Sequence, residues 1–155
     1  MPPAKRQPTQ IIAPAPARLR QHAREVVAIF NTSPDTINLL RDVLEHAGLL
    51  TVSAYTFDIR DGRVDLEAFV RAHKPNVILY DIAPPYERNW RLFDHLRQTI
   101  LAEYRFVITS TNPSRVEPFV DRDQRVYEVV DKGGDLDVIV RATREALRSR
   151  STRLA

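Results

Sequence analysis

The chain of 155 residues contains no cysteine, only four glycines, and no apolar run long enough to cross a bilayer. Without cysteine, the chain offers no disulfide bond, no thiolate metal ligand and no cysteine nucleophile. The loop at residues 30–35 has no glycine, which argues against a flavodoxin-like nucleotide site built on backbone amides. No apolar segment follows the basic N-terminus, so we expect no secretory signal and a cytoplasmic location.

The net charge of +3 conceals basic ends and an acidic body. Residues 1–24 carry five basic side chains and no acid, while residues 141–155 carry five arginines and a single glutamate. The part between them is therefore net negative. This distribution makes nucleic-acid binding by a folded basic face unlikely to be the function, although the ends alone could bind nucleic acid or anionic lipid.

Residues 1–24 also hold five of the eleven prolines and few large apolar side chains. Proline removes backbone donors, so this segment is expected to be a disordered basic tail. A plain solubilising leader is one interpretation, and docking to an acidic partner or a membrane surface is another. We place a single folded domain at residues 25–148 and a second basic tail at residues 149–155.

From Glu25 onward, apolar runs alternate with helical patterns. The runs predict strands at residues 26–30, 50–57, 77–81, 105–111 and 126–130. The helix after the first strand begins at Ser33-Pro34-Asp35, which supplies an N-cap, a first-turn proline and an acid. The alternation predicts an α/β fold, a doubly wound five-stranded parallel sheet in the order 2-1-3-4-5, which is the flavodoxin-like arrangement.

Asp81 ends the third apolar run, and a proline-marked loop follows at once. Ligands and chemistry collect at the carboxyl ends of parallel strands, so this carboxylate is a candidate site residue. Lys132 follows the fifth apolar run in the same way. If the two side chains meet, the lysine holds the carboxylate ionised. The plainer alternative is that Asp81 caps its loop and Lys132 is solvated.

Three segments in matching order and spacing resemble the CheY-like receiver domain of two-component response regulators. They are residues 75–81 (PNVILYD), residues 90–97 (WRLFDHLR), and Val130-Asp131-Lys132 followed by Asp135-Leu136-Asp137. The resemblance covers residues 25–148 and implies a non-enzymatic module of phosphorelay signal transduction. It implies that Asp81 is the phosphoacceptor and Lys132 its charge partner. It further implies a hydroxyl that binds the phosphoryl group, here Thr111 by spacing, with Thr109 as the alternative.

The chain departs from that family at the acidic pair, which holds Mg²⁺ together with the acceptor aspartate. Asn31 and Thr32 stand at the two positions. Mg²⁺ prefers hard, charged oxygen ligands and gives up its water reluctantly. Replacing two carboxylates by an amide and a hydroxyl should therefore weaken metal binding, and phosphoryl transfer with it. Asn31, Asp81 and Ala83 remain weak candidate ligands, and we assign no cofactor.

Two further departures lie near the lysine. Val129 stands where receivers often have a mobile aromatic residue, and Gly133 stands where a proline usually follows the lysine. We hypothesise that Asp81 and Lys132 form a fixed electrostatic lock between the third and fifth strands. Binding of millimolar Mg²⁺, measured as shifts of the backbone amide resonances of Asn31 and Asp81, would argue against the lock.

The sequence thus favours an atypical stand-alone receiver that acts by binding proteins, either a histidine kinase or a downstream signalling protein. A homodimer through the fourth helix, fifth strand and fifth helix is a further possibility implied by the family. The first alternative is a receiver that is still phosphorylated with weak Mg²⁺ binding. The second, from another class, is a flavodoxin-like nucleotide-binding protein. We expect no output domain after residue 148, and therefore expect any signal to leave through a partner or a dimer.

Overall fold

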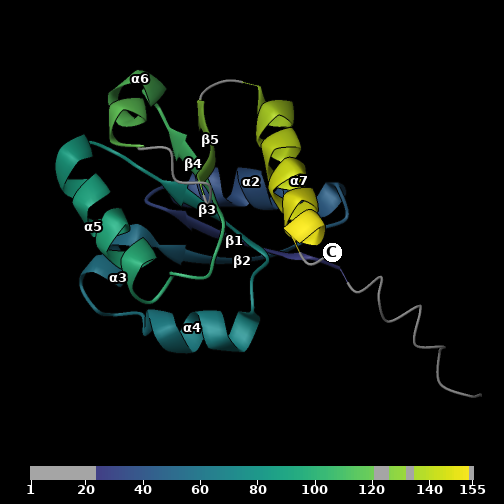
Figure 1. Cartoon of the computed structure of the whole chain (residues 1–155), viewed down its shortest axis with the longest axis horizontal. Helices are drawn as coiled ribbons and strands as arrows, with labels where there is room; N and C mark the ends of the chain where they lie inside the picture. Colours follow the sequence, from purple (N-terminus) through teal and green to yellow (C-terminus); the bar gives the residue numbers. More distant parts are fainter. Residues whose placement is uncertain (1–23, 121–125, 132–134, 154–155) are drawn as a thin grey trace, which may run out of the picture.

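The structure, a computed structural model, describes residues 24–120, 126–131 and 135–153 (Figure 1). Its centre is a parallel sheet in the order β2-β1-β3-β4-β5. The strands are β1 (Val26–Asn31), β2 (Leu50–Tyr55), β3 (Val77–Asp81), β4 (Phe106–Ser110) and β5 (Val126–Asp131). The predicted α/β fold and the order of the first four strands are confirmed, and β5 pairs with β4.

The helices connect successive strands and cover both faces of the sheet (Figure 1). They are α2 (Pro34–His46), α3 (Thr56–Arg60), α4 (Leu66–His73), α5 (Tyr86–Gln98), α6 (Pro113–Val116) and α7 (Leu136–Arg153), with a 3₁₀ turn, η1, at Glu117–Phe119. The expected start of α2 is confirmed, because the Ser33 side chain accepts a hydrogen bond from the Thr36 backbone N–H. α6 ends at Val116 and η1 follows from Glu117, next to Pro118, whose ring removes a backbone donor.

Two boundaries differ from the sequence expectation. The second strand ends at Tyr55 instead of residue 57, because Thr56 begins the short helix α3 and Ile59 packs into the core from it. The last helix continues to Arg153, beyond the expected domain end at residue 148. The predicted N-terminal tail lies outside the described residues except for Arg24.

The sheet separates two hydrophobic cores, and alternate residues of one strand enter different cores. Val27 and Ile29 of β1 belong to the core beneath α2 and α7, whereas Ala28 and Phe30 belong to the core beneath α3, α4, α5 and α6. We call these the aliphatic core and the aromatic core. Because both faces of the central strands are covered, β1, β3 and β4 are buried along nearly their whole length.

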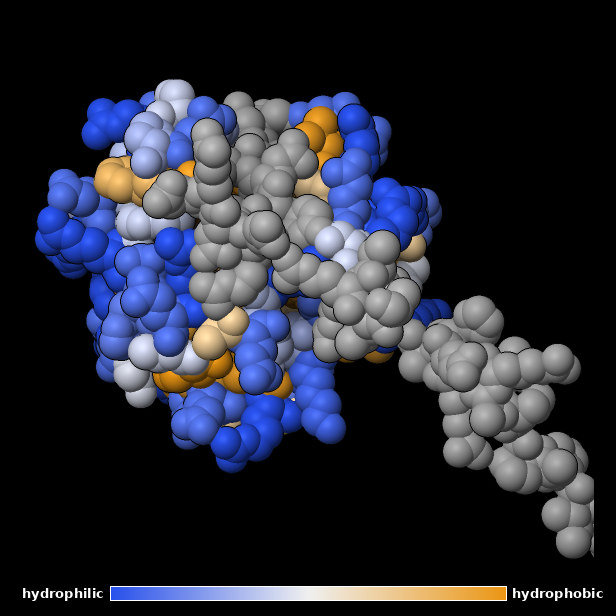
Figure 2. Space-filling view, viewed as in Figure 1, coloured by the Kyte–Doolittle hydropathy of each residue, from blue (hydrophilic) through white to orange (hydrophobic). Residues whose placement is uncertain are grey.

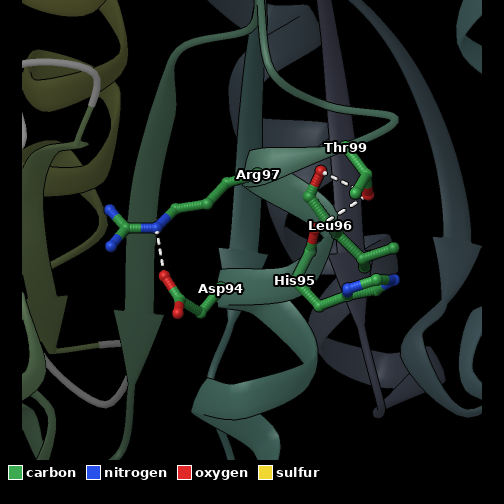
Figure 3. A network of polar contacts seen from close by, with 5 residues as sticks. All are labelled: Asp94, His95, Leu96, Arg97 and Thr99. Carbon is green, nitrogen blue, oxygen red and sulfur yellow. Dashed lines mark hydrogen bonds and ion pairs between the residues drawn. The ribbon is translucent and has the colours of Figure 1, made fainter.

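The aromatic core also contains a buried cation, Arg97 near the end of α5. Its guanidinium lies 5.2 Å from the ring centroid of Trp90, and its Nε donates to the Asp94 carboxylate at 2.7 Å. Figure 3 shows this side chain pointing away from His95 and Thr99, which lie on the other side of the helix. The ring face and the carboxylate together stabilise a charge that is 9% exposed.

Hydrophilic side chains cover most of the described surface in the view of Figure 2. The large hydrophobic side chains that are exposed, Leu39, Leu50 and Ile100, come from three different parts of the chain. Within the described part of the chain, no helix is both long enough and apolar enough to span a membrane.

Candidate functional site

Asp81 lies at the carboxyl end of the central strand β3, where it is 3% exposed. Val77 and Leu79 of the same strand belong to the aliphatic core. Alternate side chains of a strand lie on the same face of the sheet, so the Asp81 side chain lies on the face of the aliphatic core. Phe30 of β1 pairs with Tyr80, which brings Asn31 level with Asp81 at the end of the neighbouring strand. The site predicted at this edge of the sheet therefore assembles from adjacent strands.

The hydroxyl that meets Asp81 is that of Thr109, the residue held as the alternative. Thr109 pairs with Asp81 in the sheet register, and its Oγ1 donates to Asp81 Oδ1 at 2.8 Å. Thr111, preferred from spacing, lies beyond the end of β4 and is exposed. Sheet register, not distance along the chain, decides which hydroxyl stands opposite the carboxylate, and here it is that of Thr109. Which of the two hydroxyls would bind a phosphoryl group stays a prediction.

Asn31 and Thr32 occupy the two positions that correspond to the acidic pair. The Asn31 side chain is 1% exposed, and its Oδ1 accepts a hydrogen bond from the Ser33 backbone N–H at 3.0 Å. Its Nδ2 is buried and has no hydrogen-bond partner. Thr32 is exposed and lines a cavity beside Asp81. The amide oxygen that could replace a carboxylate is thus already engaged in the turn before α2.

The loop after β3 is fastened to α5 by Asn89. Its Nδ2 donates to the Ala83 carbonyl oxygen at 2.6 Å, which fixes the course of the residues between strand and helix. Ala83 was one of three weak metal-ligand candidates, and this backbone oxygen is the ligand atom it would offer. A side-chain amide now uses that oxygen from the helix side.

The arrangement suits Mg²⁺ poorly. Mg²⁺ needs near-octahedral oxygen coordination and is bound in proteins mainly through carboxylates. Asp81 is the acid at the ends of the neighbouring strands β1, β3 and β4, and the Asn31 and Ala83 oxygens both accept hydrogen bonds. The described residues contain no group of three acidic or histidine side chains placed to hold a metal.

Several predicted features cannot be placed. Lys132 and Gly133 lie outside the described residues, so the proposed Asp81–Lys132 lock stays a prediction. The backbone of Val129 belongs to β5 and pairs with Ile108, but the Val129 side chain lies outside the described part of the structure. The other side chains of β5, which belong to the expected dimer face, also lie outside it.

A cavity of about 400 Å³ opens beside Asp81, between α3 and α5. Its polar lining includes Arg60 from α3, Arg88 and Asn89 from α5, and Thr32 and Thr56. Tyr80 also lines it, and burial raises the pKa of this phenol well above its usual value, with the Asp81 charge as a smaller cause. Tyr80 therefore stays neutral at physiological pH.

The sequence analysis did not single out Arg60, Arg88 or Asn89 as site residues. Arg88 and Asn89 lie in the segment just before the helix pattern, and a cation in the first turn of a helix was the available signal. Arg60 gave no such signal, because its place depends on the short helix α3 that the alternating pattern concealed.

No protein-family model matches this sequence, and no curated protein matches it. Solved structures do match. A response regulator from Thermotoga maritima is 14% identical with a TM-score of 0.63, covering 81% of this chain and 99% of its own. The signal receiver domain of a putative Luxo repressor protein from Vibrio parahaemolyticus is 16% identical with a TM-score of 0.63, covering 84% of this chain and 95% of its own.

A sensor protein from Polaromonas sp. JS666 gives a comparable match, at 18% identity and a TM-score of 0.63, covering 82% of this chain and 98% of its own. Such identities carry information about the fold alone. Together with the parallel sheet and the carboxylate at the end of its central strand, they lead to one conclusion: this chain has the fold of the response-regulator receiver domain.

Proposed function

We propose that this chain is a receiver-like signalling module that acts by binding protein partners, without transfer of a phosphoryl group to Asp81. The observation that carries the proposal is that oxygen atoms which could bind a metal at this site already accept hydrogen bonds within the protein. The Asn31 oxygen binds the Ser33 N–H and the Ala83 oxygen binds Asn89, while Asp81 has no second carboxylate at the end of β1. Phosphoryl transfer needs a cation to neutralise charge on the transferred group, and this edge has few ligands for one.

The partner would be a histidine kinase or a downstream signalling protein, as the receiver fold implies for its family. The face formed by α6, β5 and α7 is the proposed contact surface, and a homodimer through it is one form of the proposal. Signal would then depend on the amount or state of the partner, not on the chemistry of Asp81.

A small phosphodonor with Mg²⁺, followed by intact-mass measurement, tests the proposal. We expect no phosphoryl adduct on the natural chain. We expect an adduct on the double variant Asn31→Asp/Thr32→Asp, because two carboxylates beside Asp81 rebuild an oxygen site for Mg²⁺. An adduct on the natural chain that disappears in Asp81→Asn contradicts the proposal.

The second candidate is a receiver that is still phosphorylated slowly. The favouring observation is that Asp81 remains buried and keeps the Thr109 hydroxyl at 2.8 Å, an arrangement that could bind a phosphoryl oxygen. Titration with millimolar Mg²⁺, followed through the amide resonances of Asn31 and Asp81, separates the two candidates. Saturable shifts favour the slow receiver, and unchanged resonances favour the protein-binding module.

A further inference from the structure

We propose that the cavity beside Asp81 binds a small phosphorylated organic molecule, with the phosphate held between the guanidinium groups of Arg60 and Arg88. The inference rests on the proposed function in one respect: neither a covalent phosphoryl group nor Mg²⁺ competes for the same crevice. The ligand would supply reversibly the anion that other receivers acquire by a covalent reaction.

The dimensions fit a ligand of this class. At about 400 Å³, the cavity falls within the range of roughly 300–1,000 Å³ that is usual for small-molecule sites. Its walls come from α3 on one side and from the loop after β3 with α5 on the other. Both arginines are exposed, whereas Asp81, which also lines the cavity, is buried and forms part of its floor.

Arg88 is placed against the electrostatic preference of its helix. It lies in the first turn of α5, where the positive end of the helix dipole disfavours a cation, and the N-cap Pro85 supplies no side-chain acceptor. The nearby Glu87 pairs with Arg91 at 2.6 Å, and within the described residues Arg88 has neither an ion pair nor a side-chain hydrogen bond. A bound anion would satisfy the guanidinium and the first-turn N–H groups together.

Arg60 is held at the opposite wall by its neighbour. Its Nε donates to the Asp61 carboxylate at 3.0 Å, which raises the pKa of the guanidinium and orients it. This contact uses one edge of the planar group, and no other side-chain contact joins it to a described residue. A guanidinium fork matches phosphate oxygens in a bidentate manner, and two of them match the double negative charge of a phosphomonoester.

The rest of the lining suits an organic body better than a bare ion. Phe57, whose ring stacks on Tyr55 at 5.0 Å, forms part of the wall together with Leu92 and the two prolines of the loop. The Asp81 charge disfavours a second anion near the floor. A molecule with a phosphate at one end and an organic body at the other fits both parts of the cavity.

Isothermal titration calorimetry of the full chain with adenosine 5′-monophosphate, inorganic phosphate and adenosine tests the proposal. We expect saturable binding of the monophosphate, weaker binding of phosphate, and little binding of adenosine. Arg88→Gln and Arg60→Gln should each weaken monophosphate binding by about tenfold or more, because each removes a charge-assisted hydrogen bond. Arg91→Gln on α5 and Arg63→Gln after α3 are matched controls, since neither residue lines the cavity.

Absence of saturable binding for both phosphate compounds overturns the proposal, as does binding that Arg88→Gln and Arg60→Gln leave unchanged. Equal binding of adenosine and its monophosphate also overturns it, because the phosphate then contributes nothing. Circular dichroism of each variant confirms that the fold is intact before binding is compared.

The variant Asp81→Asn separates this inference from the proposed function. Removing the carboxylate abolishes any covalent adduct, but it should leave reversible phosphate binding intact or strengthen it, since a like charge is lost from the floor. A covalent adduct on the natural chain would refute the proposed function while the arginine-dependent binding stood. Failure of the calorimetric test would refute the inference alone.

Discussion

The two cores on either side of the sheet are built from different side chains. The aliphatic core beneath α2 and α7 consists of branched residues and of two alanines, Ala142 and Ala146, on α7. The aromatic core contains Phe30, Tyr80 and Phe93 among its fully buried side chains. The buried residues of one core are therefore all aliphatic, whereas the other core combines aliphatic side chains with large rigid rings.

This difference explains where the molecule has room for function. Rings in the aromatic core meet in tilted and edge-to-face pairs, such as Phe93 with Phe106 at 4.9 Å and 87°. The same face accepts the buried cation of Arg97 and carries the α3 and α5 walls of the cavity. The aliphatic face brings α7 close to the sheet through alanines and serves mainly to hold Asn31, Asp81 and Thr109 level.

The largest effect should follow from breaking the aromatic core at its centre. Phe93 is fully buried and contacts the rings of Tyr80, Trp90 and Phe106. We expect Phe93→Ala to lower the free energy of unfolding by about 3–5 kcal/mol, measured by urea denaturation. Leu44→Ala, in the aliphatic core, is the comparison and should cost less. An equal or greater loss at Leu44 would show that the rings add nothing beyond their size.

The aliphatic core should lose more stability than the protein surface when a side chain is enlarged. Ala146 on α7 is fully buried, so Ala146→Leu forces the three additional carbons of leucine into a packed layer. We expect a loss of about 1–3 kcal/mol in the free energy of unfolding. The control Ala72→Leu, at an exposed position of α4, should change it by less than about 0.5 kcal/mol. A harmless Ala146→Leu would mean that this face is loosely packed.

The smallest loss of stability is expected at the candidate site, where β3 and β4 end. Thr109→Val removes the hydroxyl that donates to the buried Asp81 carboxylate, and should cost about 1–2 kcal/mol. Thr111→Val should leave thermal and chemical stability unchanged, because that side chain is exposed beyond the strand. A larger loss of stability for Thr111→Val than for Thr109→Val would indicate that Thr111 is the partner of Asp81.

Much of this fold could be predicted because its central strands are covered on both faces. Apolar runs such as Val77–Tyr80 are typical of strands covered on both faces, and their alternation with helical patterns favours this topology. The helix α3 was missed because Tyr55, Thr56 and Phe57 continue a strand-like pattern with high β-propensity residues. The burial of Thr56 and Ile59 overrides that local preference.

The candidate site could be located from the sequence only in part. Asp81 was singled out because an apolar run stops there, whereas Asn31 and Thr32 came from the resemblance to receiver domains. Thr109 required the register of β3 against β4, which no spacing along one chain supplies. The cavity and its arginines required the placement of α3 beside α5, which is a property of tertiary packing.

The length of α7 has a practical consequence for anyone shortening the chain. Arg105, buried at the start of β4, donates from Nη1 to the Ser149 hydroxyl at 2.8 Å, so the final turns of the last helix are tied back to the sheet. A truncation at residue 148 deletes that acceptor. An expression boundary beyond Arg153 keeps it.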